Sequence, residues 1–247
     1  MDLEDVSRHW NRLGTEDPLW AVLTSPGKSG NRWSTAEFLE TGVHEVDEML
    51  DDLRERSIAV RMGSALDFGC GAGRLTQALG GAGFAKVVGI DVSRGMLDTA
   101  RKLNQYREQC SYVHNDQPDI SVIDDNSMDL VYSSRVLQHL PPKLAHIYIA
   151  EFFRIARPGG IVVFQIPSHP TRTPAGVALR LAPDLLLNRL RKGMQMHGTR
   201  ESSVASIVLA ANGAVLAVEP DQAAGARWIS RRYLCRSGDA DSLRQGG

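Results

Sequence analysis

Short apolar runs alternate with amphipathic stretches through the middle of this chain. Mainly apolar runs lie at 65–68, 86–91 and 161–165, with helically spaced apolar residues in the segments between them, such as Met96, Ala100 and Leu103. Strands buried in a parallel sheet appear as continuous apolar runs, and alternation with helices is typical of right-handed crossovers. The pattern therefore predicts an α/β fold with a doubly wound, mostly parallel sheet over residues 61–236.

The segments on either side of this alternation have a different character. Residues 1–60 hold three of the four tryptophans, a loop-forming stretch at 25–32, and apolar residues at Val43, Val46, Leu50 and Leu53. This spacing predicts an amphipathic helix, so we expect a helical cap or lid over residues 1–60.

After Pro167 the alternation of strands and helices stops, which predicts an insertion at 167–200. We expect this insertion on the side of the sheet where a substrate would bind. Its stretch 179–192 is basic and rich in leucine. Two roles stay open for that stretch: an amphipathic helix covering the sheet, or a mobile surface that engages an anionic, lipid-linked or glycan acceptor. A helix near 204–211 and strands near 214–219 and 228–235 follow, and residues 237–247 are predicted to be disordered.

Composition excludes several classes of protein. The 247 residues suffice for one α/β domain, and a net charge of −1 gives no electrostatic case for nucleic acid or an anionic surface. The first residues do not resemble a signal peptide, and no apolar run approaches the length of a membrane helix. Three separated cysteines without metal-binding spacing fit a reducing cytoplasm.

The most specific motif is a glycine-rich turn. Residues 65–73 read ALDFGCGAG, and a helical pattern begins at Arg74. Glycines at 69, 71 and 73 let a ligand approach bare backbone beside a helix N-terminus. The dinucleotide fingerprint requires glycine where Arg74 stands, and no Lys-Ser/Thr pair closes a P-loop, so both are excluded. An acid at the entrance, Asp67, suits a ligand that carries an ammonium group.

A second acid, Asp91, ends the next apolar run. At the end of a strand, such a carboxylate can accept two hydrogen bonds from a ribose. Its alternative role is as N-cap of the helix that begins near Ser93, and the two roles are compatible.

These features together resemble the class I S-adenosylmethionine-dependent methyltransferases. The resemblance rests on the glycine turn, Asp91, the run ending at Asp116, the run 129–134 with the residues after it, and the Pro158-Gly159-Gly160 turn before 161–165. It implies a Rossmann-like seven-stranded sheet with an antiparallel last strand. It also implies S-adenosylmethionine as cofactor, with S-adenosylhomocysteine as product.

The resemblance further implies the residues that hold the cofactor. We expect the glycine turn and Asp67 near its methionine part, Asp91 at the ribose and Asp116 near the adenine. The expected cofactor-binding residues are Trp33, Asp67, Gly69, Cys70, Gly71, Gly73, Arg74, Asp91, Val92, Met96, Asn115, Asp116, Ser133 and Ser134.

Alternative roles stay open for several of these residues. Asp67 has the alternative of bonding only to loop amides, and Trp33 that of simple packing instead of closing over the cofactor. Ser133, like Arg135 beside it, has the alternative of a surface or capping residue. We interpret Cys70 as a small residue that fits the loop, and not as a nucleophile.

Methyl transfer to a hydroxyl requires a base, and His139 is the candidate. Histidine titrates near neutrality, and His139 is the one histidine placed just after the fourth strand. Its alternative is to cap or pack the helix entering at Pro141, and His197 is a competing base. Some relatives have Glu-His here and bind a divalent metal. Gln138 replaces that glutamate and removes the anionic ligand, so the sequence assigns no metal ligands and gives a divalent metal no support, while leaving it as an open alternative.

The N-terminal segment 17–33, DPLWAVLTSPGKSGNRW, and the closing segment 210–235, AANGAVLAVEPDQAAGARWISRRYLC, are similar to actinobacterial methyltransferases encoded near sugar and glycan biosynthesis enzymes. That resemblance implies O-methylation of a sugar or oligosaccharide, such as a mannoside of a methylated polysaccharide. Two alternatives stay open: methylation of nitrogen or carbon in another small molecule, and a non-catalytic cofactor-binding subunit. The base-clamping motif of nucleic-acid methyltransferases is missing after the fourth strand, and a homodimer is compatible with the sequence.

Overall fold

The computed structural model describes residues 3–171 and 195–238. Its seven strands follow the order β3-β2-β1-β4-β5-β7-β6, and β7 is antiparallel to both of its neighbours. The predicted fold class is therefore confirmed. The chain divides into two compact units, residues 1–117 with 128–132, and residues 118–127 with 133–247. The boundary expected after residue 60 stays a prediction.

The first unit contains four parallel strands. They are β1 (Ser64–Phe68), β2 (Lys86–Asp91), β3 (Cys110–His114) and β4 (Met128–Ser133, of which 128–132 belong to this unit). Their side chains are almost entirely buried, with Ala65, Leu66 and Val87 at 0% exposure. Each such aliphatic side chain contributes about 1.5–3 kcal/mol on burial, which explains why the apolar runs predicted these strands correctly.

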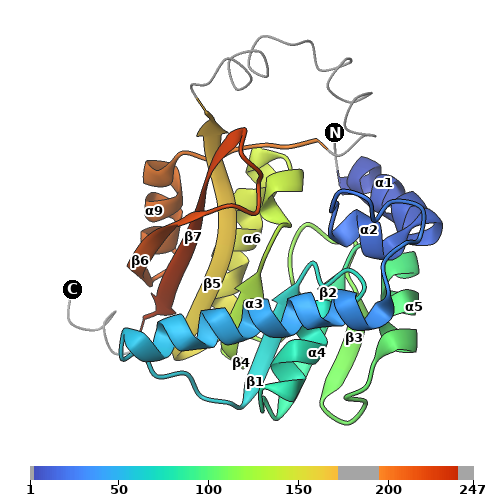
Figure 1. Cartoon of the computed structure of the whole chain (residues 1–247). Helices are drawn as coiled ribbons and strands as arrows, with labels where there is room; N and C mark the ends of the chain where they lie inside the picture. The colour runs from blue at the N-terminus through green and yellow to red at the C-terminus, as the bar shows by residue number, and fades with distance from the viewer. Residues whose placement is uncertain (1–2, 172–194, 239–247) are drawn as a thin grey trace, which may run out of the picture. The chain divides into compact units, whose positions relative to one another are not determined.

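Five helices accompany these strands, and Figure 1 shows α3 running alongside α4, and α1 beside α5. They are α1 (Leu3–Glu16), α2 (Pro18–Val22), α3 (Thr35–Glu55), α4 (Arg74–Gly81) and α5 (Arg94–Leu103). The helical character expected for residues 1–60 is present. On the predicted amphipathic face, Val46, Leu50 and Leu53 are buried, but Val43 is exposed.

Local chemistry fixes where α3 begins. The Ser34 hydroxyl accepts a hydrogen bond from the backbone N–H of Glu37, while the Glu37 carboxylate accepts one from the backbone N–H of Ser34. This capping box satisfies amides that the helix itself leaves free. Lys28 adds an ion pair to Glu37 at 2.8 Å, which ties the preceding loop to the helix.

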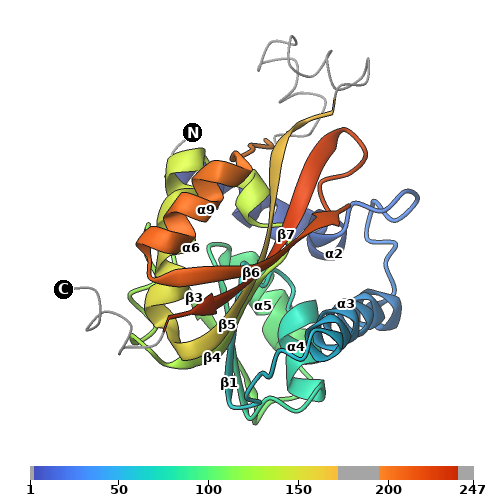
Figure 2. The same ribbon diagram turned by 90° about the vertical axis from the view of Figure 1, so that its left-hand side faces the viewer.

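The described part of the second unit combines three strands with two α-helices. It contains the short 3-10 helix η1 (Leu137–His139), α6 (Pro142–Ile155), β5 (Ala156–Pro170), α9 (Glu201–Ala210), β6 (Gly213–Asp221) and β7 (Trp228–Ser237). Figure 2 shows α9 lying along α6 and the long β6–β7 hairpin. Phe164 packs between Phe152 and Tyr233, stacking on the tyrosine at 5.1 Å between ring centroids.

Some predicted boundaries in this unit are wrong. The Pro158-Gly159-Gly160 segment lies within β5 and not in a turn before it, because the strand begins at Ala156. The same strand continues to Pro170, into the expected insertion, and Ser237 ends β7 instead of beginning a disordered tail. The basic stretch 179–192 and residues 239–247 lie outside the described residues.

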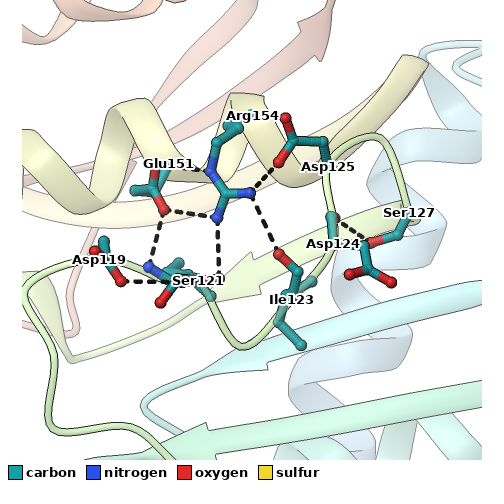
Figure 3. A network of polar contacts seen from close by, with 9 residues as sticks. Asp119, Ser121, Ile123, Asp124, Asp125, Ser127, Glu151 and Arg154 are labelled. Atoms are coloured by element: carbon teal, nitrogen blue, oxygen red, sulfur yellow. Dashed lines mark hydrogen bonds and ion pairs between the residues drawn. The ribbon is translucent and has the colours of Figure 1, made fainter.

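Segment 118–127 is fastened to α6 by one arginine (Figure 3). The Arg154 guanidinium pairs with both carboxylate oxygens of Glu151 at 2.7 and 2.8 Å, and also with Asp125. It donates further bonds to the carbonyls of Ile120 and Ile123. Because one planar cation bonds to so many acceptors of this segment, we interpret Arg154 as its structural anchor.

Candidate functional site

The glycine turn has the geometry that its sequence predicted. Gly69, Gly71 and Gly73 have φ angles of +72°, +52° and +83°. The amides of Gly69 and Cys70 both donate to the carbonyl of Ile90 on β2, at 2.8 and 3.0 Å. Gly73 is the N-cap of α4, so the turn presents left-handed backbone at the N-terminus of that helix.

Two of these glycines are also required by packing within the protein. A Cβ atom on Gly71 would lie 2.6 Å from Val22 of α2, and one on Gly73 would lie 2.6 Å from the hydroxyl oxygen of Tyr112. The sequence attributed the glycines to a ligand alone. The structure adds that a helix of the N-terminal region lies directly against the turn.

Asp91 holds the turn in place. Its two carboxylate oxygens accept hydrogen bonds from the backbone N–H of Gly71 at 2.9 Å and of Ser93 at 2.8 Å. Burial raises the pKa of Asp91, and these amide bonds oppose the shift. The N-cap of α5 is Ser93 and not Asp91, since the Ser93 hydroxyl accepts from the Met96 amide. A carboxylate offers about four lone-pair sites, and the Val92 amide also bonds to Asp91, so about one site is left for a further donor.

Asp67 is a buried carboxyl beneath the turn, only 1% exposed. Its Oδ2 accepts a 2.7 Å hydrogen bond from the hydroxyl of Thr76 on α4, while its buried Oδ1 has no hydrogen-bond partner among the described residues. Burial raises its pKa to about 7, against the opposing effects of Thr76 and the nearby Arg74. A buried, unsatisfied carboxylate oxygen fits a donor or a cation better than it fits empty space.

Arg74 is held by the N-terminal region. Its side chain, 2% exposed, forms a 2.7 Å ion pair with Glu45 of α3 and donates to the carbonyl of Thr41. Tyr132 of β4 donates to the other Glu45 oxygen at 3.1 Å. The structure therefore gives Arg74 a role in joining α3 to α4, and its contact with a cofactor stays a prediction.

The remaining predicted residues of the first unit surround the ends of β2 and β3. The Val92 carbonyl accepts from His114, and the Asn115 amide donates to the Asp91 carbonyl. Asp116, half-exposed, accepts from Gln117, which lowers its pKa. Val92 and Asn115 thus lie beside Asp91, and a role for any of the three residues at a cofactor stays a prediction.

Met96, Cys70 and Trp33 have protein neighbours of their own. Met96 is buried where α5 meets Gly14 of α1. Burial raises the pKa of the Cys70 thiol well above its ordinary value, consistent with a packing role. Trp33 donates its indole N–H to the Leu23 carbonyl and meets the Phe38 ring edge-on, so its described contacts are packing contacts.

The second unit carries the base candidate within a buried polar chain. His139 Nδ1 lies 2.9 Å from the Gln195 carbonyl, and its Nε2 lies 3.1 Å from the side-chain amide of Gln138. The Gln138 oxygen accepts from Gln165 of β5 at 3.3 Å, and Gln165 also donates to Ser230 of β7 at 2.6 Å. Both ring nitrogens of His139 are therefore engaged by the protein.

The other predicted residues of this unit lie around the same chain. The His197 amide donates to the Gln138 carbonyl at 2.7 Å. The Arg135 amide donates to Gln165 at 3.1 Å, and its guanidinium donates to the Ala223 carbonyl. Ser133, fully buried, ends β4, and Ser134 follows it at intermediate exposure. Within the described residues, no group of three or more His, Cys, Asp or Glu side chains could hold a metal ion.

Comparisons with known proteins agree with this architecture. Residues 66–164 match the family model described as a methyltransferase domain. A magnesium protoporphyrin IX methyltransferase from Synechocystis, solved with bound S-adenosylhomocysteine, is similar over 96% of this chain and 100% of its own, with a TM-score of 0.67 at 19% identity. The fold is that of the class I methyltransferases.

Relatives by sequence cover less of the chain. A ubiquinone biosynthesis O-methyltransferase from Aromatoleum aromaticum is 31% identical over 148 residues, which are 59% of this chain and 61% of that relative. A malonyl-[acyl-carrier protein] O-methyltransferase from Yersinia pestis is 29% identical, over 61% of this chain and 57% of its own. The chain thus spans about three fifths of these relatives' length, and similarity to glycan methyltransferases in particular stays a prediction.

Sequence reasoning missed several residues of this methyltransferase fold. Thr76 and Glu45 complete the surroundings of Asp67 and Arg74, and neither belongs to a recognisable motif. Gln165 did carry a signal, because a glutamine inside the apolar run IVVFQI is unusual at a buried position. Ser230 and Gln195 acquire their roles through tertiary contacts alone.

Proposed function

We propose that this protein transfers a methyl group from S-adenosylmethionine to a hydroxyl oxygen of a small-molecule acceptor. The observation that carries the proposal is the bond between Asp91 and the Gly71 amide, which joins a strand-end carboxylate to a left-handed glycine turn. The methyltransferase-domain match over 66–164 and the O-methyltransferase names of the relatives support it.

The residues of the first unit fit such a cofactor. Asp91 would accept a hydrogen bond from a ribose hydroxyl, and the glycine turn would lie along the methionine part. Asp67 would face the ammonium group, directly or through water, because its Oδ1 is buried and unsatisfied. Asn115 and Asp116 would lie near the adenine. When bound, the cofactor supplies an electrophilic methyl group on a sulfonium.

His139 is the proposed base. It would take the proton of the acceptor hydroxyl on Nε2, while the oxygen electron pair forms the new bond to the methyl carbon and the carbon–sulfur bond breaks. The acceptor hydroxyl must first replace the Gln138 amide at Nε2, since that nitrogen is occupied. His197 remains the competing base, because its backbone is bonded to the same glutamine.

For the acceptor we propose a sugar or oligosaccharide hydroxyl, such as that of a mannoside, on the terminal segments quoted above. A second candidate is a ubiquinone precursor with a ring hydroxyl, favoured by the names of the relatives. Methylation at nitrogen or carbon, and a non-catalytic binding subunit, are the other functions that the same fold permits. We found no helix in the described part of the chain long and apolar enough to cross a membrane.

Calorimetric titration with S-adenosylhomocysteine tests the cofactor assignment. We expect the wild-type protein to bind it, and Asp91→Ala to lose at least about 100-fold in affinity because charged hydrogen bonds to the ribose and the turn disappear. Asp98→Ala is the matched control, since that aspartate lies exposed on α5. Absence of binding to the wild type would refute the proposal.

Product release tests the acceptor. S-adenosylhomocysteine formation is measured with mannose oligosaccharides, with a hydroxylated ubiquinone precursor, and with an amine in place of the alcohol. Turnover on the first confirms the sugar proposal, and turnover on the second alone replaces it. Binding without turnover on any acceptor favours the non-catalytic subunit.

A further inference from the structure

A continuous line of hydrogen bonds crosses the second unit from one backbone group to another. It runs from the Arg135 N–H to Gln165 Oε1, from Gln165 Nε2 to Gln138 Oε1, from Gln138 Nε2 to His139 Nε2, and from His139 Nδ1 to the Gln195 carbonyl. We call this line the Gln165–Gln138–His139 chain. Its two glutamines are 2% and 5% exposed, so water cannot readily replace a lost bond.

The two ends of the chain fix the direction of every bond within it. A backbone N–H only donates, so Gln165 must present its oxygen to Arg135 and its NH₂ group to Gln138. Gln138 must then accept with its oxygen and donate with its own NH₂ group to the imidazole. At the other end a backbone carbonyl only accepts, so Nδ1 must carry a proton.

His139 is thereby restricted to one protonation state. Nδ1 bears hydrogen and Nε2 presents its lone pair to Gln138. A proton on Nε2 would meet the Gln138 NH₂ group, and turning that amide over would set its NH₂ against the NH₂ of Gln165. Each alternative places two donors face to face in a buried site, which is strongly disfavoured.

An unusual backbone conformation marks the start of the chain. Arg135 has φ of +65°, a left-handed conformation that is uncommon for a non-glycine residue and is often found at functional sites. Its amide is the donor that orients Gln165. Among the described residues, the charged groups bonded near the chain include the Arg135 guanidinium, which donates to the Ala223 carbonyl, and Asp221, which accepts from Ser230. His197 contributes its backbone N–H to the Gln138 carbonyl.

We propose that Gln165 and Gln138 are positioning residues that hold His139 as the neutral Nδ1–H tautomer, with an unprotonated Nε2 that can take the proton of a hydroxyl once that hydroxyl replaces the Gln138 amide. The proton transfer to Nε2 rests on the proposed function, whereas the Nδ1–H tautomer of His139 does not depend on it. A base must present an unprotonated nitrogen, and here two glutamines and the Arg135 backbone amide set the direction of the hydrogen bonds that keep Nε2 unprotonated.

The substitution Gln165→Glu tests the proposal without touching the imidazole, because Gln165 is linked to His139 only through Gln138. A carboxylate at 165 only accepts, so Gln138 must turn its NH₂ group toward it and its oxygen toward His139. Nε2 must then carry a proton, while Nδ1 still donates to Gln195. We expect ¹⁵N NMR of histidine-labelled protein at about pH 8 to show one protonated nitrogen of His139 in the wild type and two in the variant. The His139 signals are those absent from His139→Ala.

A matched control and a second variant keep the test decisive. Gln222→Glu makes the same change at an exposed position of the same unit and should leave the His139 signals unchanged. If Gln165→Glu does not fold, Gln138→Glu puts an acceptor directly against Nε2 and should give the same doubly protonated ring. An unchanged tautomer in a folded variant, or a wild-type ring protonated on Nε2, would overturn the proposal.

Turnover provides an independent reading. In Gln165→Glu we expect kcat to fall by at least about tenfold while S-adenosylhomocysteine affinity stays within about twofold, because a protonated base cannot accept a proton. The NMR result needs neither cofactor nor acceptor. Failure of the methyltransferase proposal would therefore appear in the binding titration and would leave the tautomer result interpretable.

Discussion

The glycine turn of the first unit and the Gln165–Gln138–His139 chain of the second are built in opposite ways. In the turn, backbone amides of residues 69–71 are held by groups of the next strand, namely the Ile90 carbonyl and the Asp91 carboxylate. In the chain, Gln138 of η1 bonds to its neighbour His139 and to Gln165 of β5, and Gln165 bonds to Ser230 of β7, 65 residues further along the sequence. The first arrangement is local and tolerates few side chains, while the second depends on the identity of each one.

This difference teaches where specificity can change within such a fold. A cofactor that is bound by backbone groups of a glycine turn and by one carboxylate needs only a few defined residues. Such a site can therefore be recognised as a short sequence motif. A polar side-chain chain can be rebuilt by single substitutions without disturbing the turn. Separate effects on binding and on turnover are therefore expected for substitutions in the chain and in the turn.

The largest effect is expected for His139→Ala. Loss of the proposed base should lower turnover by about 10²- to 10⁴-fold while leaving S-adenosylhomocysteine affinity within about twofold. His44→Ala, at an exposed position of α3, is the control and should change neither. Wild-type turnover in the His139 variant would show that the chain has no part in proton transfer.

A smaller but substantial effect is expected at Asp67. Its folded pKa is about 7, whereas an unfolded aspartate titrates near 4. The folded state therefore holds the proton more tightly, and stability falls as the pH rises between these two values. Asp67→Asn removes this dependence, so the variant should gain a few kcal/mol relative to the wild type between about pH 4 and pH 8.

Urea unfolding at a series of pH values checks this prediction, with Asp98→Asn as the exposed control. If the free energy of unfolding depends on pH in the same way for the wild type and for Asp67→Asn, the pKa of Asp67 is not raised by folding. That result would contradict the presence of a buried, unsatisfied carboxyl with a raised pKa beneath the glycine turn.

Gly71→Ala separates backbone strain from crowding. Alanine at a φ of +52° costs about 1–2 kcal/mol, and its Cβ would also meet Val22 at 2.6 Å, adding about 1 kcal/mol. Gly27→Ala isolates the strain, because Gly27 has φ of +78° with nothing near its Cβ position. Thermal unfolding should rank Gly71→Ala below Gly27→Ala, and Val22→Ala added to Gly71→Ala should recover part of the difference. Equal losses would contradict packing of α2 on the turn.

The smallest effect is expected at Arg154, outside both regions. Arg154→Ala should cost about 1–2 kcal/mol, since its partners include the partly buried Glu151, whereas Arg101→Ala should cost less than about 0.5 kcal/mol. The Arg154 bonds lower the pKa of Glu151, so this contribution is present above the ordinary glutamate pKa and is lost as the pH falls through the folded value. Equal losses of unfolding free energy for Arg154→Ala and Arg101→Ala in denaturant titrations would contradict the anchoring role of Arg154.

The sequence by itself determined the parallel strands, the turn and its acids. Apolar runs such as Ala65–Phe68 can be satisfied only by burial, and glycines 69, 71 and 73 allow the left-handed backbone that the turn adopts. These requirements depend on residues that are close together in the sequence, so the sequence alone predicts them. The same reasoning placed Pro158-Gly159-Gly160 in a turn, whereas pairing along β5 drew it into the strand.

Only the tertiary structure decided what each polar side chain bonds to. Gln165, Ser230 and Gln195 meet His139 and its neighbours because β5, β7 and η1 converge, and no local pattern encodes that convergence. The ion pair of Arg74 with Glu45 of α3 likewise comes from the tertiary structure alone. Hydrogen bonds select partners by position in space, and burial makes each choice costly to change.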